Sequence, residues 1–207
     1  MSNDLSRVLS RAVQPSVDVP PFWRIRPPGA PEPDGGVRIV LEAGPGFGDG
    51  AHETTQLCLQ AMAAAPRAAS ARMLDFGSGS GVLSIGAARL GLSVDAVEID
   101  AAAIEHAAHN AGLNGVASSI RVHRTLDALQ GPYALVVANI LRPVLLSFAP
   151  ALVSRLAANG TLVLSGSLST DVPEIIARYS ALLGGRRPTV HERGEWRAVV
   201  FWAPRAP

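Results

Sequence analysis

The segment Asp75-Phe-Gly-Ser-Gly-Ser-Gly81 has the clearest chemical pattern in the chain. Its glycines let the backbone turn tightly and let a ligand come close to the end of a strand. Glu98 lies 21 residues after Gly77, at the end of the next apolar run. A carboxylate at that place can accept hydrogen bonds from both hydroxyls of a ribose. The pairing therefore indicates a ribose-bearing cofactor rather than a plain tight turn.

The residue at position 82 discriminates between a dinucleotide and other ribose-bearing cofactors. A dinucleotide-binding fingerprint, G-x-G-x-x-G/A, requires a small residue there, and this chain has Val82. S-adenosyl-L-methionine carries no pyrophosphate and suits the pattern better, with S-adenosyl-L-homocysteine as its product. A nicotinamide oxidoreductase is a distant alternative. The residues expected at the cofactor from these two strand ends are Asp75, Gly77, Gly79, Glu98 and Ile99.

A second glycine-rich segment, residues 44–50, runs into His52-Glu-Thr-Thr-Gln56. Its glycines permit positive φ, and the start of the following helix offers free N–H groups that suit the methionine carboxylate. The zinc motif H-E-x-x-H is excluded, because Gln56 stands where the second histidine must be. Cys58, between two leucines, is expected to be a small core residue rather than a nucleophile.

No metal site is predicted from the other histidines. They show no ligand spacing beyond one i, i+3 pair, His106 and His109, on an alanine-rich stretch. We expect that pair to face solvent.

The composition excludes several classes of protein. All 18 basic residues are arginine, so the chain has neither the lysine of a Walker phosphate loop nor that of a pyridoxal-phosphate enzyme. The net charge of +1 gives little attraction to nucleic acid. A single cysteine, no apolar run long enough for a membrane span and no signal peptide together predict a cytoplasmic protein.

Strands and helices are expected to alternate from about residue 37. This order is typical of a doubly wound, mostly parallel α/β sheet, with ligands at the carboxyl ends of the strands. The last two strands are expected to form an antiparallel pair. The expected strands are 37–41, 72–76, 94–99, 120–122, 135–140, 161–164, 189–192 and 196–202, and the expected helices are 52–64, 82–90, 101–113, 143–158 and 171–183.

Residues 1–36 are expected to form a proline-rich N-terminal arm, and residues 37–207 the domain proper. Seven prolines lie between Pro15 and Pro33. Leu5, Val8, Leu9 and Val13 could form a short amphipathic helix, or that piece could fray in solution. The pair Phe22-Trp23 is expected to anchor the arm to the domain; the alternative is that it covers a ligand.

The chain resembles the PrmA family of S-adenosylmethionine-dependent methyltransferases, which act on a large-subunit ribosomal protein. The resemblance covers about Val37 to Trp202. It is carried by Gly46–Leu59, Leu74–Asn114 and Val136–Leu141, together with Leu164-Ser-Gly166 and Gly194-Glu-Trp196. The F-G-x-G-x-H-x-T-T segment and the A-N-I-L strand end are specific to this family and to relatives that methylate lysines of the electron-transfer flavoprotein β subunit.

The resemblance implies a seven-stranded Rossmann-like sheet and assigns roles to single residues. By it Thr55, Gly77, Glu98 and Asn139 contact the cofactor, and Phe47 and Gly48 close over it. Residues 138–141 also face the target nitrogen, which makes Asn139 the catalytic candidate: its side-chain oxygen would orient an amine. Asp49 or Glu53 could move a proton, or both could be solvated loop carboxylates.

The sequence departs from the family at three places. Asp49 replaces the usual threonine of F-G-T-G, Glu98 replaces the usual aspartate, and a proline-rich arm stands where the family has a substrate-docking domain. The expected function is N-methylation of amino groups, lysine or N-terminal, on a protein that is ribosomal or other. The alternatives are a small-molecule or peptide methyltransferase, or a catalytically silent cofactor-binding interaction protein, with a homodimer joined through the arm as one arrangement.

Overall fold

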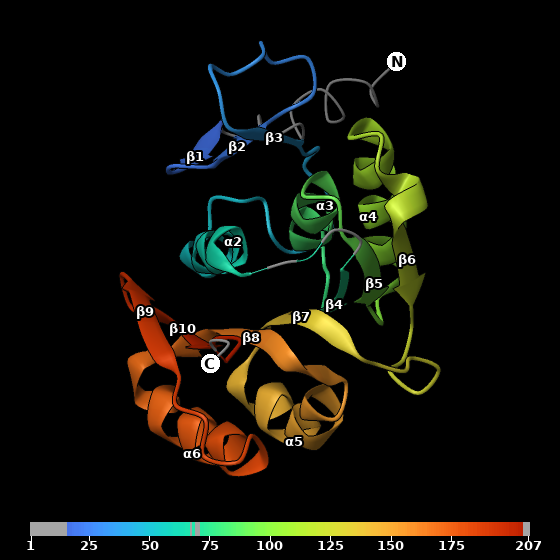
Figure 1. Ribbon diagram of the computed structural model, residues 1–207. Coiled ribbons are helices and arrows are strands. Elements are labelled where there is room, and N and C mark those ends of the chain that lie inside the picture. The colour runs from blue at the N-terminus through green and yellow to red at the C-terminus, as the bar shows by residue number, and fades with distance from the viewer. Residues whose placement is uncertain (1–15, 67, 69–70, 205–207) are drawn as a thin grey trace, which may run out of the picture.

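The computed structural model describes residues 16–66, 68 and 71–204 of the chain. Its central sheet contains β4 (Arg72–Phe76), β5 (Ser93–Val97), β6 (Ile120–His123), β7 (Tyr133–Asn139), β8 (Leu156–Leu168), β9 (Thr189–Arg193) and β10 (Trp196–Phe201). These seven strands lie in the order β6-β5-β4-β7-β8-β10-β9 (Figure 1). β10 is antiparallel to both of its neighbours, and the other pairs are parallel. The predicted mostly parallel sheet with a C-terminal antiparallel pair is confirmed.

Helices cover both faces of this sheet. They are α2 (Glu53–Ala64), α3 (Val82–Arg89), α4 (Ala101–Leu113), α5 (Arg142–Val153) and α6 (Val172–Leu182), with short 3-10 turns at Ala117–Ser119 and Ser169–Asp171. α2, α3 and α4 lie on one face, and α5 and α6 on the other (Figure 1). Within the described residues, no helix is long and apolar enough to cross a membrane.

The two covered faces explain why the central strands are apolar at successive positions. Val137 belongs to the hydrophobic cluster on the α2–α3 side. Its neighbour Val136 belongs to the cluster on the α5–α6 side. Successive side chains of a strand point to opposite faces, so a strand that is buried on both sides needs apolar residues at every position.

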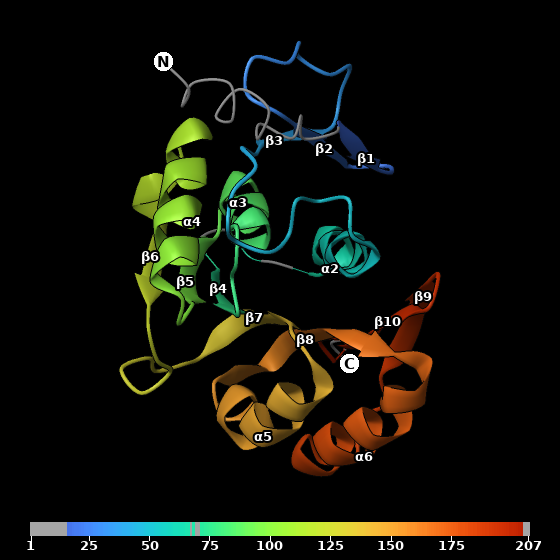
Figure 2. The same cartoon turned by 180° about the vertical axis from the view of Figure 1, so that it is seen from behind.

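Residues 17–40 form a second, smaller sheet, with β1 (Val17–Val19) antiparallel to β2 (Trp23–Arg26) and β2 parallel to β3 (Val37–Val40). This sheet lies beyond α2 and α3 (Figure 2). Trp23 is fully buried, and its indole N–H donates to the Leu59 carbonyl of α2 at 2.7 Å. The described part of the predicted arm is thus folded onto the domain, and Trp23 is the anchor that we expected. The boundary at residue 36 stays a prediction, and the expected helix over Leu5–Val13 lies outside the described residues.

The end of α5 differs from the prediction. The sequence favoured a helix over 143–158 that stops at Asn159-Gly160, but α5 ends at Val153 and β8 already begins at Leu156. Leu156 pairs with Tyr133 of β7, and the Tyr133 N–H donates to the Arg155 carbonyl at 2.8 Å. Pairing with a distant strand has therefore overridden the helical propensity of the alanines at 157 and 158.

The predicted strand 161–164 is also too short at its other end, because β8 continues to Leu168. The remaining elements predicted from residue 37 onward agree with the structure to within about two residues. Asp100 is the N-cap of α4, as predicted, and its carboxylate accepts a hydrogen bond from the Ala102 N–H. Cys58 is fully buried, as expected for a core residue.

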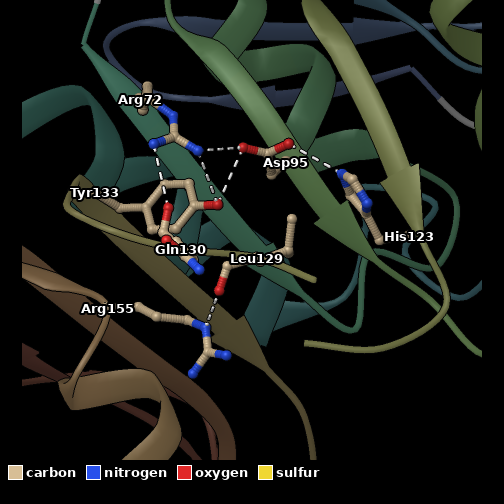
Figure 3. A network of polar contacts seen from close by, with 7 residues as sticks. All are labelled: Arg72, Asp95, His123, Leu129, Gln130, Tyr133 and Arg155. Carbon is tan, nitrogen blue, oxygen red and sulfur yellow. Dashed lines mark hydrogen bonds and ion pairs between the residues drawn. The ribbon is translucent and has the colours of Figure 1, made fainter. Parts of the chain in front are cut away.

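A polar network joins four neighbouring strands of the sheet (Figure 3). Asp95 of β5 accepts from Arg72 at 2.9 Å and from the Tyr133 hydroxyl at 3.0 Å, and His123 lies 3.0 Å from its other oxygen. Burial of the carboxyl works against ionisation, but these hydrogen bonds outweigh it and hold the pKa of Asp95 below its usual value. These residues tie β4, β5, β6 and β7 together.

Candidate functional site

A cavity of about 490 Å³ opens at the carboxyl ends of β4, β5 and β7. In a doubly wound sheet this is the edge where ligands bind. Its lining residues come from six parts of the chain and are Pro45, Phe47, His52, Thr54, Gly77, Gly79, Glu98, Asp100, Ala103, Asn139, Ile140, Leu141, Gly166 and Trp196. Five of the predicted site residues are among them: Phe47, Gly77, Gly79, Glu98 and Asn139.

The two glycine-rich loops hold each other in place. The Ser80 N–H donates to the Phe47 carbonyl at 2.8 Å, and the Ser80 hydroxyl donates to the Gly48 carbonyl at 2.5 Å. Gly79 has a φ of +53°, and a Cβ there would lie 2.4 Å from the Phe47 oxygen. Glycine is therefore required at position 79 both for its backbone conformation and for the close approach of the other loop.

Glu98 follows β5 and points its carboxylate at the glycine loop. One oxygen accepts from the Gly79 N–H at 3.0 Å, and the other accepts from the N–H groups of Ile99 and Asp100 at 2.8 and 3.0 Å. Three backbone donors thus fix the carboxylate beside the cavity. A carboxylate has about four lone-pair sites and these donors occupy three, so the oxygen that faces Gly79 can still accept from a ribose hydroxyl.

Asn139 ends β7 and lies in register with Ser165 of β8. Its side-chain oxygen is buried and accepts no hydrogen bond from any described residue. The neighbouring strand end is closely packed, because a Cβ on Gly166 would lie 2.6 Å from the Ile140 carbonyl. A buried acceptor beside a cavity favours a ligand that carries a hydrogen-bond donor.

Two predicted site residues lie behind the cavity rather than on its wall. Asp75 is fully buried and accepts from the Ser84 hydroxyl of α3 at 2.6 Å. Burial raises the pKa of Asp75 to about 6; the Ser84 hydrogen bonds oppose the shift, and the charge of Glu98 adds to it. Thr55 is also fully buried, and its hydroxyl makes no hydrogen bond within the described chain. Burial, with the nearby Asp75 charge, raises the pKa of the Cys58 thiol as well.

Gly48 and Ile99 also do not line this cavity. Gly48, in the loop before α2, is buried and has a φ of +98°. Ile99 is 75% exposed, and its carbonyl accepts from Arg124 at 3.0 Å. Their assignment to the cofactor stays a prediction.

An aromatic wall, made of Phe47, His52 and Trp196, was not foreseen as a unit. The His52 ring lies edge-on to both neighbours, with centroid distances of 5.3 Å to Phe47 and 4.9 Å to Trp196. His52 also caps α2, since its Nδ1 accepts from the Thr54 N–H. Trp196 was singled out only as part of the Gly194-Glu-Trp196 turn that resembles the family. Nothing in the local sequence indicated that its ring would contact His52, which lies 144 positions earlier.

The expectation that His106 faces solvent is wrong. His106 is half-buried, and both of its ring nitrogens contact the backbone of the loop before α2. His109 agrees better with the expectation: it is exposed and pairs with the Glu42 side chain. In the described part of the chain, no three His, Cys, Asp or Glu side chains are grouped so that they could hold a metal ion.

Comparison with known proteins gives a consistent result. The family model described as "Ribosomal protein L11 methyltransferase (PrmA)" matches residues 16–203. A ribosomal protein L11 methyltransferase of Pelobacter propionicus is 40% identical over 189 residues, which is 87% of this chain and 59% of that protein. One of Trichlorobacter lovleyi is 43% identical over 143 residues, or 66% of this chain and 47% of that protein. The chain thus spans about half of the length of these two relatives.

Among solved structures, the chain is similar to a ribosomal protein L11 methylase from Lactobacillus delbrueckii subsp. bulgaricus. The TM-score is 0.80 at 29% identity, and the match covers 92% of this chain and 99% of that one.

Proposed function

The chain belongs to the ribosomal protein L11 methyltransferase (PrmA) family, and from this premise we propose that it is an S-adenosylmethionine-dependent N-methyltransferase that acts on amino groups of a protein. The acceptor groups would be lysine side chains or an N-terminal amine. We expect it to act in the cytoplasm, where ribosomal proteins are made.

The observation that carries the proposal is the convergence of Glu98 and Asn139 on one cavity. Three backbone N–H groups hold the Glu98 carboxylate at one place on the cavity wall. Asn139 presents a buried acceptor without a partner in the described chain at another. Gly77 and Gly79 also line the cavity and place no side chain in it. These groups fit an adenosine ribose and, further along, a nitrogen that carries hydrogens.

When bound, S-adenosylmethionine supplies a methyl group on a positively charged sulfur. The chain's own residues align the acceptor and exclude water. A lysine of pKa ~10.4 must lose its proton, which costs about 4 kcal/mol near pH 7.4. The Asn139 oxygen can accept a hydrogen bond from the neutral amine and hold its lone pair toward the methyl group.

The charge of the cavity suits a cationic acceptor. Glu98 and Asp100 line it, and no arginine of the described chain does. Asp49 is exposed, and its carboxylate accepts from the Ala51 N–H at 2.8 Å, so it shapes the loop. Asp49 does not line this cavity, so the proposal assigns it no proton transfer.

The relatives are named for ribosomal protein L11, which makes that protein the first acceptor to test. The purified chain would be incubated with tritiated S-adenosylmethionine and either ribosomal protein L11 or a lysate of the source organism, divided into protein and small-molecule fractions. Label in L11, or in one other protein band, supports the proposal. Label confined to small molecules would replace it with a metabolite methyltransferase.

Asn139→Ala separates catalysis from cofactor binding. We expect turnover to fall at least ~100-fold, while the cofactor Kd, measured by calorimetry, changes less than about fivefold. Asn159→Ala, an exposed position in β8, is the matched control. Equal losses of turnover and of cofactor binding in Asn139→Ala would remove the proposed role. Cofactor binding by the wild type without transfer to any acceptor would favour the catalytically silent alternative.

A further inference from the structure

Three side chains, two on α4 and one at its C-cap, form a polar ladder against the chain segment 40–46. They are His106, Asn110 and Asn114, spaced four residues apart, so they lie along one face of the helix. Segment 40–46 runs from the end of β3 past α4 toward α2 (Figure 2). Each rung bonds to the backbone of this segment, much as a neighbouring strand would.

The lower two rungs hold the start of the segment. The Asn114 side chain accepts from the Val40 N–H at 2.8 Å and donates to the Val40 carbonyl at 2.7 Å. The Asn110 side chain accepts from the Glu42 N–H at 3.0 Å and donates to the Ser80 carbonyl at 3.0 Å. Asn110 thereby links the segment to the glycine loop after β4.

His106 forms the upper rung, nearest the cavity. Its Nδ1 accepts from the Gly46 N–H at 3.2 Å, and its Nε2 lies 2.8 Å from the Glu42 carbonyl and 3.2 Å from the Asn110 side-chain nitrogen. The Gly46 N–H can only donate and the Glu42 carbonyl, the nearer neighbour of Nε2, can only accept, so these two contacts together fit a ring with its proton on Nε2. The ring also packs on Gly44, where a Cβ would lie 2.5 Å from Nε2.

The two residues on either side of Gly46 are walls of the cavity. Pro45 and Phe47 both line it, and a Cβ on Gly46 would lie 2.7 Å from the Ser80 nitrogen. Segment 44–47 is thus held on one side by the glycine loop and on the other by the His106 ring.

We propose that His106 is a positioning residue for the cofactor site: by bonding to the backbone at Gly46 and Glu42, it fixes the wall formed by Pro45 and Phe47. The proposal rests on the proposed function for its effect on S-adenosylmethionine, but the hold on the loop stands on the geometry of the chain alone. Nothing in it requires His106 to touch the cofactor or the reacting atoms.

The test compares His106→Phe, His106→Asn and His109→Asn. Phenylalanine keeps a flat ring of similar size without either hydrogen bond. Asparagine places an acceptor near the position of Nδ1, so it can still receive the Gly46 N–H. His109 lies on the same helix, is exposed and bonds to a side chain instead of to the loop backbone, so His109→Asn is the matched control.

Two measurements decide the matter. Hydrogen exchange of the Gly46 amide, followed by ¹⁵N NMR, should be about five- to tenfold faster in His106→Phe, as expected for the loss of one or two hydrogen bonds. The Kd for S-adenosylmethionine should rise by a similar factor, with kcat at saturating cofactor nearly unchanged. His106→Asn should recover part of both effects, and His109→Asn should show neither.

The outcomes separate the two proposals. If the wild type fails to bind S-adenosylmethionine, the proposed function is wrong. The exchange rate of the Gly46 amide, compared between wild type and His106→Phe, then still tests whether His106 holds the loop. Wild-type exchange at Gly46 in folded His106→Phe would overturn the positioning role. If His106→Phe does not fold, the ¹⁵N signals of the wild-type imidazole take its place: a ring protonated at Nε2 alone supports the proposal, and a proton on Nδ1 contradicts it.

Discussion

At the scale of single residues, the carboxylates of Asp75 and Glu98 lie at neighbouring strand ends but differ in burial and in hydrogen-bond donors. Asp75 is fully buried and bonds to the Ser84 hydroxyl. Glu98 is half-buried and receives three backbone N–H groups. Donors stabilise an ionised carboxylate, while burial penalises it. Glu98 is therefore suited to binding a ligand, and Asp75 to packing beneath the site.

Glu98→Ala is expected to weaken binding of S-adenosylmethionine by about 10- to 100-fold, because hydrogen bonds to a charged acceptor are lost. Titration calorimetry measures the change. Glu98→Asp should recover part of the affinity, and Glu105→Ala, an exposed position on α4, should retain all of it. A Kd within twofold of the wild type in Glu98→Ala would rule out the assignment to the ribose.

Asp75→Asn is expected to change how stability depends on pH. Burial in the folded chain raises the pKa of Asp75 to about 6 from its ordinary value of 3.8. Between these values the folded state binds the proton that the unfolded state releases, so the free energy of unfolding falls as the pH rises through this window. Asparagine does not titrate, so this fall in the free energy of unfolding is absent from the variant. The variant should gain up to about 3 kcal/mol relative to wild type between pH 4 and 7.

Urea unfolding at several pH values measures that difference. Asp127→Asn, at an exposed position, serves as the control. A difference between Asp75→Asn and wild type that stays constant from pH 4 to 7 would contradict the raised pKa.

At the scale of elements, the site depends on two loops that interlock. The loop before α2 and the loop before α3 exchange hydrogen bonds through Ser80. α4 then holds the first loop through its polar ladder. The cavity wall is thus set by three elements together, although each helix begins where its own sequence predicts.

Gly79→Ala tests this interlocking. The new Cβ would meet the Phe47 oxygen at 2.4 Å, so the loops must separate. Gly91 also has a positive φ, but nothing lies within 4 Å of a Cβ there, so Gly91→Ala carries the backbone cost without the clash. We expect cofactor affinity to fall about tenfold or more in Gly79→Ala and to stay near wild type in Gly91→Ala. Equal affinities in the two variants would show that the close approach is unimportant.

At the scale of the whole molecule, the small N-terminal sheet belongs to the same core as the methyltransferase sheet. Trp23, Ile25 and Ile39 are fully buried in the cluster that also contains Leu59 of α2 and Ile85 of α3. Ile25 also reaches the loop before α2, because a Cβ on Gly50 would lie 2.3 Å from its Cδ1. The folded unit therefore includes residues that the sequence suggested were an arm.

Trp23→Phe is expected to lower the free energy of unfolding by roughly 1–3 kcal/mol, since it removes the bond to the Leu59 carbonyl and leaves unfilled space. Trp202→Phe, at a half-buried position near the end of β10, should cost less. Urea denaturation compares them. An unchanged midpoint for Trp23→Phe would mean that the N-terminal sheet unfolds separately.

The sequence alone determined the alternation of strands and helices, the glycine loop with Glu98 at the next strand end, and the cap at Asp100. These follow from apolar periodicity, backbone freedom and capping, which act over a few residues. The tertiary structure decided what joins distant segments: the start of β8 at Leu156, the packing of Trp23 on α2, the aromatic wall from Phe47 to Trp196, and His106 on the loop at Gly46. Such contacts depend on which surfaces the fold brings together, and local patterns do not record that.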